Sequence, residues 1–323
     1  MGISVLNATL VSCTLKNLLV FSAFHTFNSF VTSKQSLEIS SSFFSNSLSN
    51  IIQSYNQNIN LLISKTQISH TLSSAIFLDN ANDNIYCNLG HIPYSSSIES
   101  KLIDGNDNWD SSDIDHHFSY LSPECGDSIL ILDCLFCYCY CSDAYRDYGG
   151  GGAIFVNYSC HISIARTIFD KCYTIGYRGG ALMVTGGSKY VGYYINDTLS
   201  YEIGIKYCCF QNCYAINHGI YGSCAFLAGQ NTTVDFVSSV NCSDHFENFG
   251  AQFDIQAKIV RFSNVNVTGG LAKFCGGIEF RAADILSFQF NTLNDIKACF
   301  LLTFVIFQDS NISHCNLVNN KEY

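Results

Sequence analysis

The chain has 323 residues, enough for one large domain or two ordinary ones. Its 26 acidic residues outnumber its 16 Lys and Arg residues, and the net charge of -10 disfavours binding to the phosphate backbone of a nucleic acid. Hydrophobic residues form 48% of the chain and charged residues 13%, which excludes an intrinsically disordered protein.

A four-position pattern recurs along the chain. Two apolar residues stand two positions apart, an apolar anchor follows five positions later, and Cys, Ser or Thr follows three positions after the anchor. In chain order the copies are Ile3, Val5, Leu10 and Cys13; Leu37, Ile39, Phe44 and Ser47; Leu61, Ile63, Ile68 and Thr71; Ile129, Ile131, Phe136 and Cys139; Ile162, Ile164, Phe169 and Cys172; Ile203, Ile205, Phe210 and Cys213; and Val305, Phe307, Ile312 and Cys315. Apolar residues two positions apart are typical of a strand with one face turned inward. The seven copies exceed the roughly two expected by chance.

A second element, Gly-Gly-Ala followed by an apolar residue, lies between the anchors. It occurs at Gly151 to Ile154 and at Gly179 to Leu182, with weaker copies at Ser223 to Phe226, Phe249 to Gln252 and Cys275 to Ile278. Glycine permits a positive φ and lets a neighbouring backbone approach closely. We therefore predict structural turns at Gly151, Gly152, Gly179, Gly180, Gly276 and Gly277.

Alternation after each of these elements predicts which side chains point outward. We expect Ala153, Phe155, Ala181, Met183, Ala225, Leu227, Ala251, Phe253, Ile278 and Phe280 to point inward, and Ile154, Leu182, Phe226, Gln252 and Glu279 to point outward. The outward column changes from apolar to polar along the chain. It is either buried under an inserted loop or available to a partner.

Repeated strand and turn units cannot bury their apolar faces alone, so the copies must stack. The sequence therefore predicts a parallel β-solenoid of about ten coils with inserted loops. We expect residues 1–323 to form one such domain, as a fragment or module of a longer protein. The pattern lapses over 79–128, which is rich in Asn, Asp and Ser and reads as a long insertion.

The combination of the Gly-Gly-Ala turn with Phe-x-x-Cys or Phe-x-x-Asn resembles known repeat families. The matching segments are Gly151 to Ile154, Gly179 to Leu182, Phe136 to Cys139, Phe169 to Cys172, Phe210 to Cys213 and Phe43 to Asn46. They resemble the repeats of chlamydial polymorphic membrane proteins and, more closely, those of Cys-rich β-helical surface proteins of trichomonad protists. The resemblance covers roughly residues 129 to 280. It implies an all-β, right-handed parallel β-helix and a role in adhesion at the cell surface or after secretion.

The location of the protein is an expectation from that resemblance alone. Residues 1–4 lack the basic stretch of a signal peptide, and Leu18 to Phe21 is too short for its apolar core. The longest apolar run, Ala298 to Phe307, has ten residues, whereas a membrane-spanning helix needs about 20. We therefore expect no membrane span in this chain.

Cysteine is unusually frequent, with 17 residues. The pattern places Cys13, Cys139, Cys172, Cys213 and Cys315 at one equivalent position of successive coils. Coils about 5 Å apart would allow disulfides between such residues. Reduced thiols packed as small buried side chains are the favoured interpretation. The cluster from Cys134 to Cys141 is interpreted as strand packing rather than a metal site.

Two functions remain open. The favoured hypothesis is a non-enzymatic scaffold that contacts a protein or glycan partner, with no cofactor and no metal. The alternative is a carbohydrate-active enzyme of the pectate-lyase-like β-helix type, whose chemistry needs clustered carboxylates on one strand face. The strand-borne acids Asp235, Asp254 and Glu279 are scattered in sequence, which favours the scaffold.

Overall fold

The computed structural model describes residues 7–18, 24–26, 35–47, 51–54, 59–71, 74–79, 128–141, 151–157, 161–175, 178–185, 202–215, 222–242, 250–281, 284–305 and 308–322. Within these ranges the protein is all-β, with strands and turns and no helix. The predicted insertion 79–128 lies outside the described residues except at its ends, Asp79 and Ser128.

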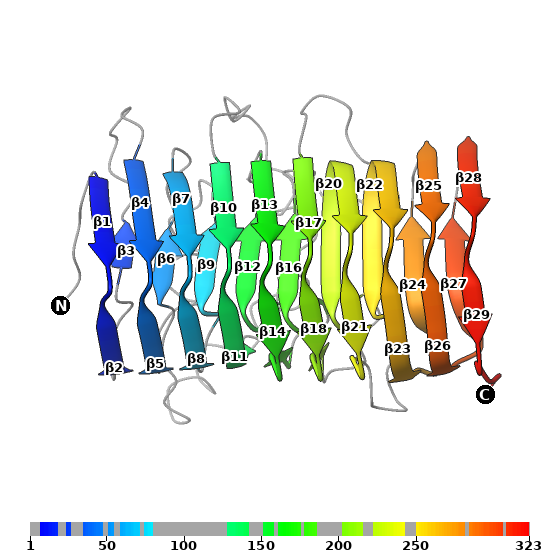
Figure 1. Ribbon diagram of the computed structural model, residues 1–323, viewed down its shortest axis with the longest axis horizontal. Helices are drawn as coiled ribbons and strands as arrows, with labels where there is room; N and C mark the ends of the chain where they lie inside the picture. The colour runs from blue at the N-terminus through cyan, green and yellow to red at the C-terminus, as the bar shows by residue number, and fades with distance from the viewer. Residues whose placement is uncertain are drawn as a thin grey trace, which may run out of the picture.

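The strands form a 17-stranded and a 12-stranded sheet in which neighbouring strands are parallel (Figure 1). The larger sheet consists of two rows, here called row 1 and row 3, which meet in the long strands β20 (Ala225–Asp235) and β22 (Phe253–Ser263). The smaller sheet is row 2.

The rows contain the following strands. Row 1 has β1 (Asn7–Val11), β4 (Gln35–Ser40), β7 (Ile59–Ser64), β10 (Ser128–Leu132), β13 (His161–Ala165), β17 (Glu202–Lys206), the second halves of β20 and β22, β25 (Ile285–Gln289) and β28 (Asp309–Ser313). Row 2 has β2 (Thr14–Leu18), β5 (Phe43–Ser47), β8 (Gln67–Thr71), β11 (Leu135–Cys141), β14 (Ile168–Asp170), β18 (Cys209–Gln211), β21 (Ser238–Val240), β23 (Asn266–Leu271), β26 (Thr292–Lys297) and β29 (Asn316–Val318), with the short β15 (Tyr173–Thr174) and β19 (Tyr214–Ala215) beside it. Row 3 has β3 (Phe24–Thr26), β6 (Ile52–Ser54), β9 (Ile76–Asp79), β12 (Ile154–Asn157), β16 (Leu182–Thr185), the first halves of β20 and β22, β24 (Cys275–Arg281) and β27 (Phe300–Val305).

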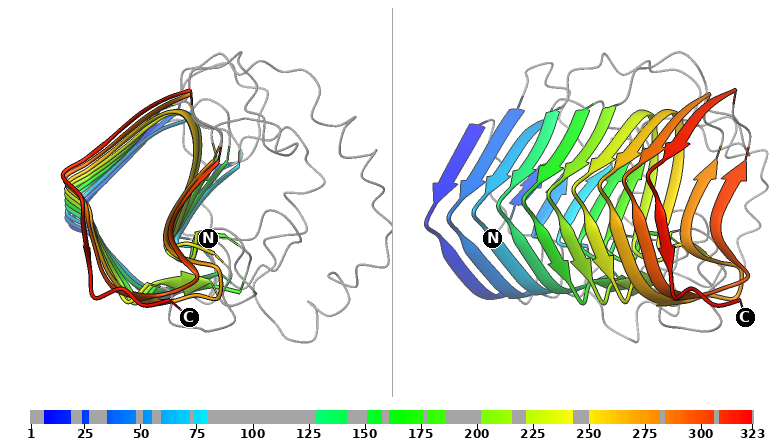
Figure 2. Two further views of the ribbon diagram at one scale, coloured as in Figure 1. Left: turned by 90° about the vertical axis from the view of Figure 1, so that its right-hand side faces the viewer. Right: turned by 45° about the vertical axis from the view of Figure 1, so that its right-hand side comes forward.

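The chain visits the rows in turn, so each strand pairs with the strand of the same row in the next repeat. Thus β10 pairs with β13 in row 1, β11 with β14 in row 2, and β12 with β16 in row 3. Seen along the stack, the three rows surround a common interior (Figure 2). This arrangement is consistent with a β-solenoid, as the repeated pattern predicts.

The interior is filled by side chains that the parallel register stacks on their equivalents. In row 2, Phe136, Phe169 and Phe210 are fully buried, with ring centroids 5.2 and 4.7 Å apart. In row 1, Ile131, Ile164 and Ile205 pair in the same way. All of them belong to one hydrophobic core, because inward side chains from all three rows meet there.

The corners of the coil are built by residues in the left-handed conformation. At the first corner, between rows 1 and 2, these are Ser12, Ser41, Lys65, Asp133, Arg166, Tyr207, Phe236, Asn264, Phe290 and His314, with φ between 49° and 57°. At the second corner, near the end of row 2, they include Asn46, His70, Tyr138, Lys171, Asn212, Asn241, Asp295 and Asn319. Most corners therefore use a residue other than glycine, and each side chain there projects from the coil edge.

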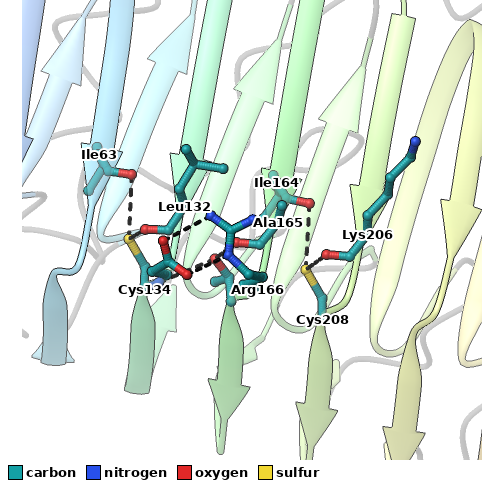
Figure 3. A network of polar contacts seen from close by, with 10 residues as sticks. Ile63, Leu132, Cys134, Ile164, Ala165, Arg166, Lys206 and Cys208 are labelled. Atoms are coloured by element: carbon teal, nitrogen blue, oxygen red, sulfur yellow. Dashed lines mark hydrogen bonds and ion pairs between the residues drawn. The ribbon is translucent and has the colours of Figure 1, made fainter.

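The residue after each left-handed residue is often Cys, Ser or Thr, for a reason visible at the first corner. Ser42 Oγ donates a hydrogen bond to the Ser40 carbonyl at 2.8 Å. In the same way Cys134 Sγ donates to the Leu132 carbonyl at 3.1 Å, as Figure 3 shows. Cys134 Sγ also lies 3.6 Å from the Ile63 carbonyl of the preceding coil. A small side chain with one donor thus satisfies carbonyls at the bend.

Candidate functional sites

The predicted turn glycines occupy positions that no side chain could share. Gly151 and Gly179 have φ values of 65° and 56°, and a Cβ at Gly179 would overlap the Leu182 carbonyl oxygen. A Cβ at Gly180 would overlap backbone atoms of Ser223 and Tyr214 in the next coil, and Gly152 is equally enclosed by Tyr173. These four glycines precede row 3 strands, where the coil bends and the backbones meet.

Gly276 and Gly277 differ from the other four because they lie inside strand β24. The pairing of β24 with β27 shifts register between Cys275 and Ile278, which places the two glycines at an irregularity of the ladder. A Cβ at Gly277 would overlap the Leu301 carbonyl oxygen. The glycines therefore accommodate a close approach within a strand rather than a separate turn.

The predicted cysteine ladder is divided between the two corners. Cys139, Cys172 and Cys213 occupy one column at the second corner, where pairing of their strands also brings in Cys242. Their thiols donate to carbonyls of the preceding coil, for example Cys172 to Phe136 at 3.5 Å. These three members of the predicted set are in register with one another.

Cys13 and Cys315 belong to the first corner instead. Each follows a left-handed residue, Ser12 or His314, in the column that also contains Cys134 and Cys208. The sequence pattern does not distinguish the two columns, because both corners share the same local sequence. In each, an apolar residue is followed by any residue, a left-handed residue, and then Cys, Ser or Thr. The single ladder is corrected to two.

Burial disfavours the reactive thiolate form at several positions in both columns, whereas hydrogen bonds from neighbouring thiols lower the pKa of Cys242. The described ranges contain 14 cysteines, and no disulfide joins any two of them. Burial raises the pKa of Cys134 to about 11 and that of Cys208 to about 12, and it raises the pKa of Cys172 well above the usual value. Over the same residues, no group of three or more His, Cys, Asp or Glu side chains is placed to hold a metal ion.

In strands β12 and β16 of row 3, the side chains that point outward are not the predicted ones. Ile154 and Leu182 are in the core, whereas Phe155 and Met183 pack with Phe226 in a second cluster outside it. Ala153 and Ala181 also face the core, so two successive residues point inward at the bend and the alternation starts one residue later. The expectation that Gln252 points outward is wrong, because its side chain is fully buried and reaches row 2. Its side-chain oxygen Oε1 accepts a hydrogen bond from the hydroxyl of buried Ser239 at 2.6 Å.

Farther along this outward side of row 3 the apolar cluster gives way to a buried ionic group. Asp254 lies directly opposite Glu279 on the neighbouring strand, and the two side chains share Arg281. Arg281 Nη2 is 2.8 Å from Glu279 Oε2 and 3.6 Å from Asp254 Oδ2. Asp254 is 0% exposed, so burial raises its pKa to about 7, opposed by the charge of Arg281. The sequence alone did not predict this pair, because the two residues lie far apart along the chain and only the strand pairing brings them together.

The raised pKa of Asp254 predicts that the stability of the protein falls as pH rises. The folded state binds this proton more tightly than the unfolded state, whose Asp has a pKa near 3.8. The stabilisation is complete below pH 3.8 and is lost as pH rises through about 7, a difference on the order of 4 kcal/mol. Urea denaturation of the wild type and of Asp254→Asn from pH 4 to 8 measures it. The variant should show a flatter profile, and identical slopes would contradict the assignment.

A hollow of about 400 Å³ lies on the outward side of row 1. Gly204 is one of its lining residues, and it pairs with Ser163 on one side and Thr233 on the other. Its charged lining residues are His161, Glu202, Lys206 and Arg261, and Asn231 also lines it. His161 Nδ1 lies 3.5 Å from Glu202 Oε2. Nothing in the sequence pattern marked these residues, because only the register brings them together.

Aromatic side chains project from the first corner beside this hollow. Tyr207 and Phe236 are stacked at 5.0 Å, and farther along Phe290 stacks on His314 at 4.7 Å. Tyr207, Phe236 and Phe290 are 57%, 49% and 54% exposed. We call these three residues the aromatic ridge.

Comparisons with known proteins found no match: no family model, no curated protein and no solved structure is similar to the chain. In the part of the chain that the structure describes, no helix has the length and apolar character needed to cross a membrane.

Proposed function

We propose that the chain is a right-handed parallel β-helix of about ten stacked coils. The ten-strand path of row 2, with every repeat adding one strand, supports the number of coils. The handedness is supported by the path of the chain in Figure 2, which turns counterclockwise toward a viewer at the C-terminal end. It also agrees with the strong preference of parallel strand connections for the right-handed crossover.

We further propose that this β-helix is a non-enzymatic interaction scaffold of the cell-surface or adhesion type. The observation that carries the proposal is the aromatic ridge. Tyr207, Phe236 and Phe290 adopt a left-handed backbone, which is uncommon for bulky residues and costs about 1 kcal/mol or more at each. Their rings are nevertheless about half exposed. Glycine or Asn would be better suited to a corner that only had to turn, so the exposed rings point to a contact with a protein or glycan.

The enzyme alternative rests on the carboxylate pair of Asp254 and Glu279. A glycosidase needs one carboxylic acid and one carboxylate that both reach the sugar. Here Asp254 is fully buried, Glu279 is 6% exposed, and both interact with Arg281. This arrangement suits a structural ion group, which supports the scaffold over the enzyme.

The test replaces the aromatic ridge by Asn, the non-glycine residue most compatible with a left-handed corner. The variant Tyr207→Asn/Phe236→Asn/Phe290→Asn should keep or raise the urea midpoint and should lose binding to partners on a glycan array and a panel of cell-surface proteins. The control Ile168→Thr/Ile285→Thr alters two comparably exposed apolar residues outside the ridge. Unchanged binding by the ridge variant would contradict the proposal. So would polysaccharide turnover that Asp254→Asn abolishes.

A further inference from the structure

We infer that the hollow around Gly204 binds an acidic oligosaccharide. The inference deepens the proposed function, since it names a ligand class for the scaffold and a second place of contact beside the aromatic ridge. It rests on the missing side chain at Gly204, the charges around the hollow, and the arrangement of its hydrogen-bonding groups.

Gly204 is the first argument. It lies within strand β17, between paired residues Ser163 and Thr233, and it has no left-handed φ. A Cβ there would meet only the Ile162 carbonyl oxygen, at an ordinary 3.8 Å. Glycine in a strand weakens it by about 0.5–1 kcal/mol, and the described residues offer no bulge or close backbone to explain it. Close approach of a ligand to the strand backbone is a further reason for glycine in a strand, and it is the one that we infer here.

The charge of the hollow is the second argument. Lys206 and Arg261 both line it and form no ion pair with any described residue, whereas the single carboxylate, Glu202, is engaged with His161. The hollow is therefore locally positive on a protein of net charge -10, which favours an anionic ligand. Lys206 and Arg261 belong to strands two coils apart, about 10 Å along the stack, so a chain with successive acid groups can reach both.

The uncharged lining favours a saccharide over a simple anion. Ser163 and Thr233 present hydroxyl groups, and Asn231 presents an amide whose Oδ1 atom is buried without a hydrogen-bond partner. These groups can donate to and accept from sugar hydroxyls. The volume of about 400 Å³ lies within the range of about 300–1,000 Å³ typical of small-molecule sites. Tyr207 and Phe236 follow Lys206 and Asp235 in sequence, so a longer glycan can continue onto the ridge.

The experiment uses calorimetry with two probes: hyaluronan oligosaccharides, with a carboxylate on alternate sugars, and polyglucuronate oligosaccharides, with one on every sugar. The same oligosaccharides with methyl-esterified carboxylates are the matched neutral ligands. At least one acidic probe should bind, with at least tenfold weaker binding after esterification. Lys206→Gln/Arg261→Gln should lose tenfold or more in affinity and lower the salt dependence.

The decisive variant is Gly204→Val, which fills the hollow with a side chain that strands favour. It should abolish binding while the urea midpoint stays equal or rises, so lost binding cannot be attributed to unfolding. Equal binding by the esters, unchanged binding by Gly204→Val, equally strong competition by inorganic phosphate, or no binding of either probe would overturn the inference. The ridge variant tests the proposed function separately. If that variant still binds every partner while Gly204→Val no longer binds the acidic glycan, the proposal for the aromatic ridge is wrong and the inference about the hollow is supported.

Discussion

Replacing Gly180 by Ala is expected to destabilise the protein by about 3 kcal/mol or more, near the upper end for a single substitution. The added methyl would overlap the carbonyl oxygen of Ser223 and the backbone of Tyr214. Both belong to the next coil, and Gly180 itself donates its N–H to Ser223 at 2.9 Å. Relief of the overlap would separate the coils and break this bond. Urea denaturation monitored by far-UV circular dichroism gives the change in unfolding free energy.

Gly204→Ala is the matched control for this prediction. It makes the same chemical change in the same stack of coils, but its Cβ would meet nothing closer than 3.8 Å. We expect it to be neutral or to stabilise by up to about 1 kcal/mol, because alanine loses less backbone entropy on folding. If both variants shifted the urea midpoint equally, close coil contact at Gly180 would be refuted.

Phe169→Ala is expected to cost about 3–5 kcal/mol, the usual range for an aromatic residue removed from a core. Phe169 is fully buried, and its ring lies between those of Phe136 and Phe210, at 5.2 and 4.7 Å. Truncation removes two ring contacts and leaves a cavity that in-register neighbours on both sides cannot fill. The same denaturation measurement tests this.

Two controls separate core packing from stacking itself. Phe169→Leu keeps most of the volume and should cost much less than the alanine variant. Tyr207→Ala removes a ring that is also stacked, on Phe236, but is 57% exposed. It should change stability by less than about 1 kcal/mol. A cost for Tyr207→Ala as large as that for Phe169→Ala would contradict the assignment of the inner Phe column as the core.

The repeat pattern predicted the strand content and the parallel stacking because apolar alternation and turn glycines are local features. Register between coils was harder to predict, since both corners carry Cys, Ser or Thr after a left-handed residue. Leu10 to Cys13 and Phe136 to Cys139 therefore match one template, although Leu10 belongs to row 1 and Phe136 to row 2. The local sequence cannot distinguish the two corners.

The candidate sites depended on that register. Asp254 and Glu279 are 25 positions apart in sequence, whereas Phe169 and Phe210, also one coil apart, are separated by 41. Because the loop lengths vary, sequence spacing does not reveal which side chains are neighbours. Gly204 likewise reads as one glycine among 23 until its outward position between Ser163 and Thr233 is known.

The most direct test of the stacked-coil architecture is a pair of distances along the first corner. Spin labels are introduced through a keto amino acid, since the 17 cysteines rule out thiol labelling. Ser41 and Phe236 are five coils apart, and Ser41 and Phe290 are seven coils apart. At about 4.8 Å per coil, double electron–electron resonance should therefore give distances of about 24 and 34 Å. A difference of about 10 Å between the two pairs supports the stack. Equal distances, or a shorter distance for Ser41 to Phe290, would contradict it.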